Sequence, residues 1–159
     1  MKTTRLVQAV PDNNRAAERS NQFDIVDLGP FDNNRHDVLA INDVGQRAGV
    51  SLNPNNGRIE AFREGNVGRD SLGTLGGSFS VARAINNSGD VVGGSLTQGD
   101  EGFHGFIYRN NQLHDLNDYL DPACQWELIH AVGINNVGEI IAIGSHAGED
   151  RIVLLRPKA

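Results

Sequence analysis

Cysteine, tryptophan and long apolar runs are scarce in this chain of 159 residues. Its one cysteine, Cys124, has no second cysteine with which to form a disulfide or a cysteine-based zinc site. No apolar run approaches the roughly 18 residues of a membrane-spanning helix, and residues 1–10 lack the apolar core of a signal peptide. We therefore expect a soluble, cytoplasmic protein that does not enter a membrane.

A surplus of positive charge is missing too. The chain has 14 basic and 20 acidic residues, which gives a formal net charge of −6. Because no long-range field attracts phosphate backbones, a nucleic-acid partner is not expected. A basic protein partner is compatible with this charge.

One motif, Ile-Asn-x-x-Gly, occurs three times, beginning at Ile41, Ile85 and Ile134. An apolar run enters each copy and a second apolar run leaves it. Asparagine and glycine tolerate the positive φ angles of tight turns, and β-branched residues favour strands. Each copy therefore predicts a β-hairpin.

The motif belongs to a repeat of about 44 residues. This spacing relates three leucines, two phenylalanines and the first two motifs, at Leu28, Leu72 and Leu116, Phe62 and Phe106, and Ile41 and Ile85. The third motif follows the second by 49 residues, so about five extra residues precede it. Periods of this length are typical of solenoids, propellers and related arrays.

Four strands are expected in each repeat: one enters Ile-Asn, one leaves the glycine turn, one surrounds the phenylalanine and one ends at the leucine. Nineteen glycines and few aromatic residues favour an all-β fold with close turns. We predict three four-stranded repeats in a closed ring with pseudo-three-fold symmetry, resembling a small propeller, prism or trefoil. Residues 23–28 would supply the fourth strand of the last repeat, whose third strand covers residues 151–156, and so close the ring.

Two other assemblies stay open: a swapped dimer with six blades, and an open stack capped by partners. The predicted domains are an N-terminal arm at residues 1–22 and a single three-repeat β domain at residues 23–159. The arm would hold an edge strand and one helical turn.

The middle repeat carries a family signature. It reads Leu-Gly-Thr-Leu-Gly-Gly at residues 72–77, then the Ile-Asn motif at Ile85, then His-Gly-Phe at residues 104–106. This pattern resembles the bacterial HAF repeat, and the resemblance covers about residues 23–155. It implies a β-propeller-like repeat protein of a kind that is often exported, and the family carries no established activity.

Candidate binding residues lie where the repeats differ. The extra residues of the third repeat fall within residues 117–127, which contain Tyr119 and the only tryptophan, Trp126. Aromatic side chains on a loop that a rigid sheet supports commonly anchor a protein or a sugar. We predict a binding site of Trp126, Tyr119, His130, Asp121 and Glu127. The alternative is that Trp126 closes one end of the ring.

No metal, cofactor or catalytic site is predicted. The histidines occur singly, without HExxH spacing, and the acidic loops lack the spaced carboxylates of a calcium loop. His130 with Glu127 or Asp121 could act as a general base and its orienting group. No Gly-x-Ser-x-Gly nucleophile motif accompanies it.

These observations favour a non-catalytic binding module with a protein partner, such as an inhibitor or immunity-type protein, present as a monomer or swapped homodimer. Surface complementarity would act through Trp126 and Tyr119, and acidic loops would attract a basic partner. One alternative is a lectin-like propeller that binds glycans. A second is a hydrolase with a site around His130 at one end of the ring.

Overall fold

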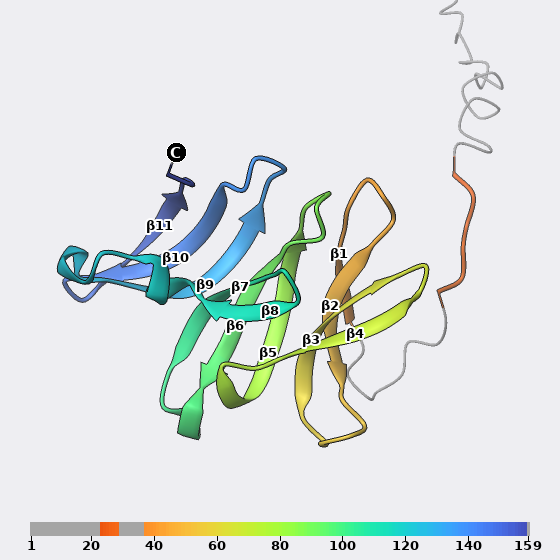
Figure 1. The fold of residues 1–159 in the computed structure, drawn as a ribbon, viewed down its shortest axis with the longest axis horizontal. Helices are drawn as coiled ribbons and strands as arrows, with labels where there is room; N and C mark the ends of the chain where they lie inside the picture. The colour runs from red at the N-terminus through yellow and green to blue at the C-terminus, as the bar shows by residue number, and fades with distance from the viewer. Residues whose placement is uncertain (1–22, 29–36, 159) are drawn as a thin grey trace, which may run out of the picture. The chain divides into compact units, whose positions relative to one another are not determined.

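The computed structural model describes residues 23–28 and 37–158 (Figure 1). These residues form β-strands and three short 3-10 helices, which confirms the expectation of an all-β fold. No helix among them has the length and apolar character needed to cross a membrane. The arm predicted at residues 1–22 lies outside the described residues.

The strands form three successive antiparallel units. The first unit contains β1 (Asp37–Ile41), β2 (Arg47–Leu52), β3 (Ile59–Gly65) and β4 (Gly68–Gly73). The second contains β5 (Gly76–Ile85), β6 (Val91–Thr97), β7 (Phe103–Arg109) and β8 (Gln112–Asp115). The third contains β9 (Trp126–Ile134), β10 (Ile140–His146) and β11 (Glu149–Leu155). The 3-10 helices are η1 (Gln98–Asp100), η2 (Leu116–Tyr119) and η3 (Pro122–Cys124).

The sheets are open. The first two units make one eight-stranded sheet, joined by a parallel pairing of Ile59 with Phe79, and the third unit is a separate sheet in the order β11-β10-β9. Residues 23–28 have no regular secondary structure, so the strand expected there is absent. A strand requires pairing of its backbone groups with a neighbour, and the strands of the described sheets do not include this segment. The closed ring is therefore not observed in the described residues.

The three Ile-Asn-x-x-Gly motifs form the turns β1–β2, β5–β6 and β9–β10, as predicted, and Figure 1 shows the three turns at the same end of the strands. In the middle turn, the side-chain oxygen of Asn86 accepts hydrogen bonds from the backbone nitrogens of Ser88 and Asp90, at 3.1 and 3.0 Å. Gly89 takes a φ of 80°, which a residue with a side chain adopts only at a cost. Local chemistry thus fixes these hairpins.

The turns are linked from unit to unit by an asparagine ladder, formed by Asn42, Asn86 and Asn135. The side-chain nitrogen of Asn42 donates to the carbonyl oxygen of Asn86 at 2.8 Å, and that of Asn86 donates to the carbonyl oxygen of Asn135 at 3.2 Å. A second row runs beside it, because the backbone nitrogen of Asn87 donates to the side chain of Asn136 at 2.8 Å. Equivalent turns therefore lie in register.

Two apolar clusters hold the units together. The first lies between the first and second units and includes Leu72 and Phe106. The second lies between the second and third units and includes Leu116 and Leu128. Burial of such side chains contributes about 1.5–3 kcal/mol each to stability. The recurring leucine and phenylalanine positions of these units thus form core, whereas Leu28 is exposed.

Candidate functional site

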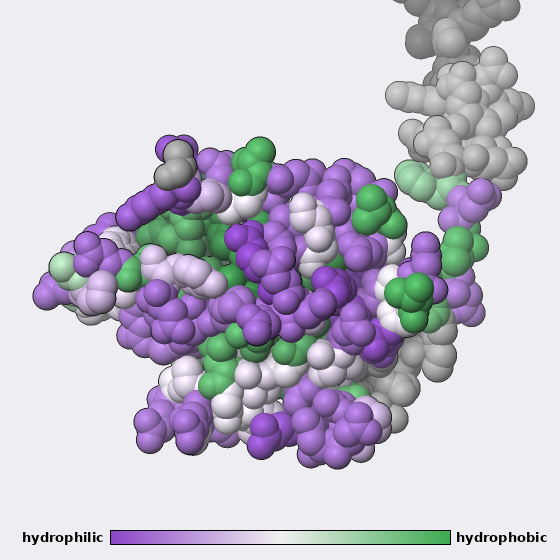
Figure 2. Space-filling model, in the orientation of Figure 1, coloured by the Kyte–Doolittle hydropathy of each residue, from purple (hydrophilic) through white to green (hydrophobic). Residues whose placement is uncertain are grey.

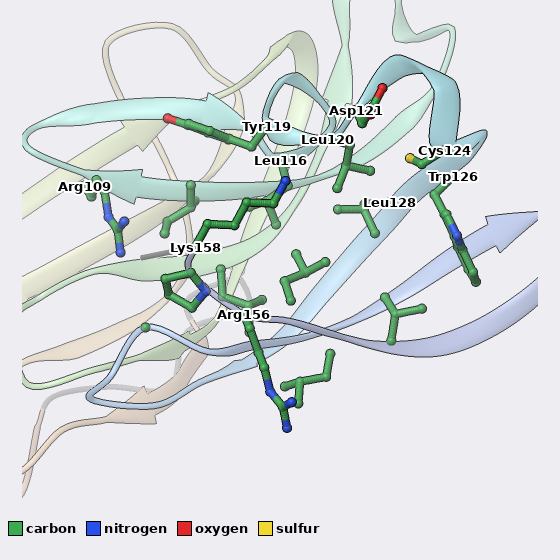
Figure 3. Close-up of a pocket in the computed structure, with 17 residues that line it drawn as sticks. Arg109, Leu116, Tyr119, Leu120, Asp121, Cys124, Trp126, Leu128, Arg156 and Lys158 are labelled. Atoms are coloured by element: carbon green, nitrogen blue, oxygen red, sulfur yellow. The ribbon is translucent and has the colours of Figure 1, made fainter.

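A pocket of about 820 Å³ opens beside the third unit (Figure 3). Its walls come from β7, the loop that carries η2 and η3, the strands of the third unit and the residues after β11. Figure 2 shows apolar surface there, framed by hydrophilic residues. The lining residues include Ile107, Leu116, Leu128, Ile140, Val153 and Leu155 on the apolar side and Arg109, Tyr119, Asp121, Trp126, Arg156 and Lys158 on the polar side.

The loop that forms one wall is fixed by hydrogen bonds at both of its short helices. Asp115 caps η2 by accepting from the backbone nitrogen of Asn117 at 2.9 Å, and Asp121 caps η3 by accepting from that of Ala123 at 2.9 Å. The Asn117 side chain then exchanges two bonds with the backbone of Leu128, at 2.7 and 3.1 Å. The wall is therefore tied to β9.

The floor is apolar and comes from several elements. Leu116 follows β8, Leu128 lies on β9 and Ile140 on β10, and all three are buried in the second core cluster. Leu155 and Val153 of β11 are partly buried against the same cluster. A pocket with this lining favours apolar groups in a ligand, because their transfer from water is favourable.

Cationic side chains gather around the pocket. Arg109 pairs with Asp90 at 2.7 Å, and Arg156 pairs with Glu139 at 3.1 Å. Lys158 adds a third positive charge (Figure 3). Because Arg109 and Arg156 are already paired, Lys158 is the cation that a ligand carboxylate would meet beside the apolar floor.

Three of the five predicted binding residues lie together in this pocket: Trp126, Tyr119 and Asp121. The Trp126 ring stacks on His146 with 4.8 Å between centroids, so its orientation is set by β10. Tyr119 is mostly exposed and meets the ring of His114 edge to face at 5.9 Å. The pocket can thus offer two aromatic side chains to a ligand.

The other two, Glu127 and His130, lie on β9, where their side chains contact β7 and β5, and they do not line the pocket. A carboxylate oxygen of Glu127 is 3.4 Å from Nε2 of His104. The His130 ring stacks on Phe103 at 5.6 Å, and its Nε2 accepts from Arg83 at 3.1 Å. Burial, and then the positive charge of Arg83, lowers the pKa of His130. The predicted set is therefore divided between a pocket and an inter-unit contact.

The histidines bring no metal group or nucleophile together in the part of the chain that the structure describes. His104 Nδ1 lies 2.5 Å from a carboxylate oxygen of Asp115, which pins β7 to β8. The described residues contain no group of three or more histidine, cysteine or acidic side chains that could hold a metal ion. Nor does either His104 or His130 hydrogen-bond a serine or cysteine there.

Sequence reasoning missed the pocket floor and the nearby cations. Leu116 is predicted only as the repeated leucine that ends a strand, Arg156 ends the last predicted strand and Lys158 follows it, and nothing in the sequence relates these residues to Trp126. The unequal spacing of the motifs was the usable signal, since it selected the loop that forms one wall.

When the chain is compared with models of known protein families, with curated proteins and with solved structures, no match is found in any of the three. The resemblance to the HAF repeat stays a prediction.

Proposed function

We propose that this protein is a non-catalytic binding module that captures an extended segment of a partner protein along β11 and in the adjoining pocket. One observation carries the proposal. Among the described strands, β11 pairs only with β10, and the apolar pocket lies against it. A free strand edge beside side-chain pockets is the arrangement used in β-strand addition, where backbone bonds give affinity and pockets give specificity.

The second unit indicates what such a segment would contact. There β8 pairs with β7, and its Leu113 lies opposite Tyr108 and packs on the first core cluster. Leu155 of β11 has the position in the third unit that Tyr108 has in the second. Tyr108 pairs with Val91, five residues after Asn86, and Leu155 pairs with Ile140, five residues after Asn135. An apolar side chain placed opposite Leu155 would therefore enter the pocket.

In this proposal the three units are consecutive blades of a propeller-like array, as in the predicted HAF repeats. The asparagine ladder and the matching strand order of the first two units support it. In the third blade, the captured segment would take the place that β4 and β8 have in the others. The partner would thus complete a sheet that the described residues leave with three strands.

Lys158 at the pocket favours acidic residues between the apolar ones, whereas Arg109 and Arg156 already pair with Asp90 and Glu139. A basic partner stays a prediction for the acidic loops. In one of these loops the carboxylate of Asp100 accepts hydrogen bonds from the hydroxyl and the backbone nitrogen of Ser78, at 2.6 and 2.7 Å, so a basic partner would share this carboxylate with Ser78.

The test uses an eight-residue peptide that alternates valine with glutamate, and a second that alternates valine with lysine. Trp126 is the only tryptophan, so its fluorescence reports occupancy of the pocket. We expect a change with the glutamate peptide and a much weaker one with the lysine peptide. No response to either peptide at any concentration, from a monomeric protein whose β11 edge is unoccupied, would reject strand capture.

Variants measured by calorimetry locate the site. Trp126→Ala should weaken binding of the glutamate peptide at least about tenfold, since buried tryptophans are frequent hot spots. The control Val67→Ala changes an exposed side chain in the turn between β3 and β4 and should leave affinity unchanged. Equal affinities of all three proteins would show that the peptide binds elsewhere.

A further inference from the structure

The first and the third unit each have one face that contacts no other described unit. Apolar side chains are exposed on these two faces, although the residues at the equivalent positions of the second unit are buried. Val92, six residues after Asn86, is 0% exposed against the third unit, whereas Ile141, six residues after Asn135, is 46% exposed. Ile140 and Ala142 beside it point into the second core cluster, so strand alternation turns Ile141 to the free side.

The same contrast occurs at the other end. Ile85 packs into the first core cluster and is 7% exposed, whereas Ile41, at the equivalent place before its asparagine, is 68% exposed. Val38 is likewise exposed where its counterpart Ala82 is buried. Each end therefore presents an apolar face of the kind that joins units inside the chain.

The asparagine ladder is also unfinished. The side-chain nitrogen of Asn86 bonds both Asp90 in its own turn and the carbonyl oxygen of Asn135 in the next unit. The side-chain nitrogen of Asn135 bonds Glu139 in its own turn at 2.9 Å, and within residues 37–158 it meets no further acceptor. In the other two turns the equivalent nitrogen, of Asn42 or Asn86, also donates to the next unit.

We propose that the partner is a second copy of this chain, whose first unit stacks on the free face of the third unit. The contact would repeat the one between the second and third units: Asn135 donates to the carbonyl oxygen of the other copy's Asn42, and Ile141 packs near its Ile41 and Val38. Two such contacts give six units, within the four to eight blades usual for a propeller.

The same arrangement fills the pocket and so rests on the proposed function. Residues 23–28 of the second copy would be the captured strand, which carries four apolar side chains and the two acidic side chains Asp24 and Asp27. Leu28 lies 13 residues before Ile41, and Leu72 lies 13 residues before Ile85, so the two segments have the same spacing to the strand that follows. A chain stacked by its first unit therefore has the right length to place this segment along β11, as β4 lies along β3.

The first experiment measures the mass of the full chain by sedimentation across a wide concentration range. We expect twice the chain mass of 17.2 kDa. Ile141→Asp should shift the mass to that of a monomer with an unchanged circular dichroism spectrum, and the control Val67→Asp should stay dimeric. A monomeric natural chain at every concentration would overturn the inference.

A second measurement tests the register. Within the chain the side chains of Asp43 and Asn87 meet at 2.8 Å. In a Cys124→Ser background, Asp43→Cys combined with Asn136→Cys should be joined by a short bismaleimide into a covalent dimer. The matched pair Asp43→Cys with Asn87→Cys should be joined within one chain. Linkage of Asp43→Cys to Asn136→Cys within one chain would overturn the second copy in favour of a closed three-unit ring.

The two proposals fail separately. If the natural chain is monomeric and still binds the glutamate peptide through Trp126, the second copy is wrong and strand capture stands. If Ile141→Asp is a folded monomer that binds no peptide, strand capture is wrong, and the dimer rests on the stacked faces alone.

Discussion

Asn42 donates its side-chain amide to the backbone carbonyl oxygen of Asn86, 44 residues away in the sequence and 2.8 Å away in space. The bond is buried and joins two turns that have the same internal hydrogen bonds. Because the acceptor is a backbone carbonyl, the bond does not depend on which side chain the acceptor residue carries. It depends on the asparagine donor and on the position of the neighbouring turn. The ladder asparagine of each turn, together with the second row beside it, thus sets the register between units.

Replacing a ladder asparagine should separate its two roles. Asn86→Ala removes three bonds within its turn and the bond to Asn135, and should lower the free energy of unfolding by about 2–3 kcal/mol. Asn135→Ala removes the equivalent bonds within its turn but no described bond to a further unit, and should cost about 1 kcal/mol less. Urea unfolding measures both variants in the Ile141→Asp background, which removes the proposed contact with a second copy, and equal losses would contradict a stabilising role of the ladder bond.

A methyl group at Gly93 should disrupt the second unit. An added Cβ there would lie 1.9 Å from the carbonyl oxygen of Val81 on the paired strand, so the strands must move apart. Gly93→Ala should cost about 1–3 kcal/mol, the usual range for overpacking. The control is Gly133→Ala, whose Cβ would meet its nearest atom at 3.9 Å. Thermal unfolding measures both variants, and an unfolding temperature of Gly133→Ala below that of Gly93→Ala would refute this account.

Glu60 should make stability depend on pH in the acid range. The residue is 4% exposed, and its carboxylate accepts hydrogen bonds from Asn53, Asn56 and Ser71. Burial raises the pKa of Glu60, but these bonds outweigh it and hold the pKa below its ordinary value of 4.5. The contribution is therefore present above pH 4.5 and lost as the pH falls through the folded-state pKa.

Glu60→Gln should accordingly cost about 1.5–3 kcal/mol at neutral pH, because it removes bonds to a charged acceptor. The difference from the natural protein should shrink at pH values well below 4.5. Glu101→Gln, at an exposed position, serves as the control and should have little effect. A difference that is constant with pH would sink the assignment.

His130 should titrate below its ordinary pKa of 6.5, because burial, and next the charge of Arg83, disfavours the imidazolium form. The unfolded chain then takes up a proton more readily than the folded one, so stability falls as the pH drops below 6.5. NMR titration of the ring gives the midpoint directly. The His130→Phe variant keeps an aromatic ring over Phe103 and should lose this part of the pH dependence. A midpoint at or above 6.5 would be incompatible with the geometry.

Local chemistry made much of the fold predictable. The asparagine and glycine of each motif define their turn within five residues, so all three hairpins could be read from the sequence. The strands β3 and β8 also fall where the repeat places them. The prediction of a strand at residues 23–28 could not be secured in this way. A run of apolar and polar side chains indicates that a segment can form a strand, but it does not indicate which strand of a sheet the segment would pair with.

The site was predictable where it depends on one loop. Trp126, Tyr119 and Asp121 lie within the extra residues of the third repeat and meet at one pocket. Glu127 lies between two pocket residues of β9, and strand alternation turns it away. His130 fails for a different reason: its place on β9 is covered by Phe103, a contact between units that only the folded chain reveals.

The loop with η2 and η3 has a practical consequence. It joins β9 at Trp126, whereas the ladder turn follows β9 at Ile134, so the two lie at opposite ends of a nine-residue strand. The additional residues of this repeat are accommodated at one end while the other keeps its bonds to Asn86. Foreign peptides could therefore be grafted at the exposed Pro122 and Ala123 of η3 for display, with the scaffold beneath them unchanged.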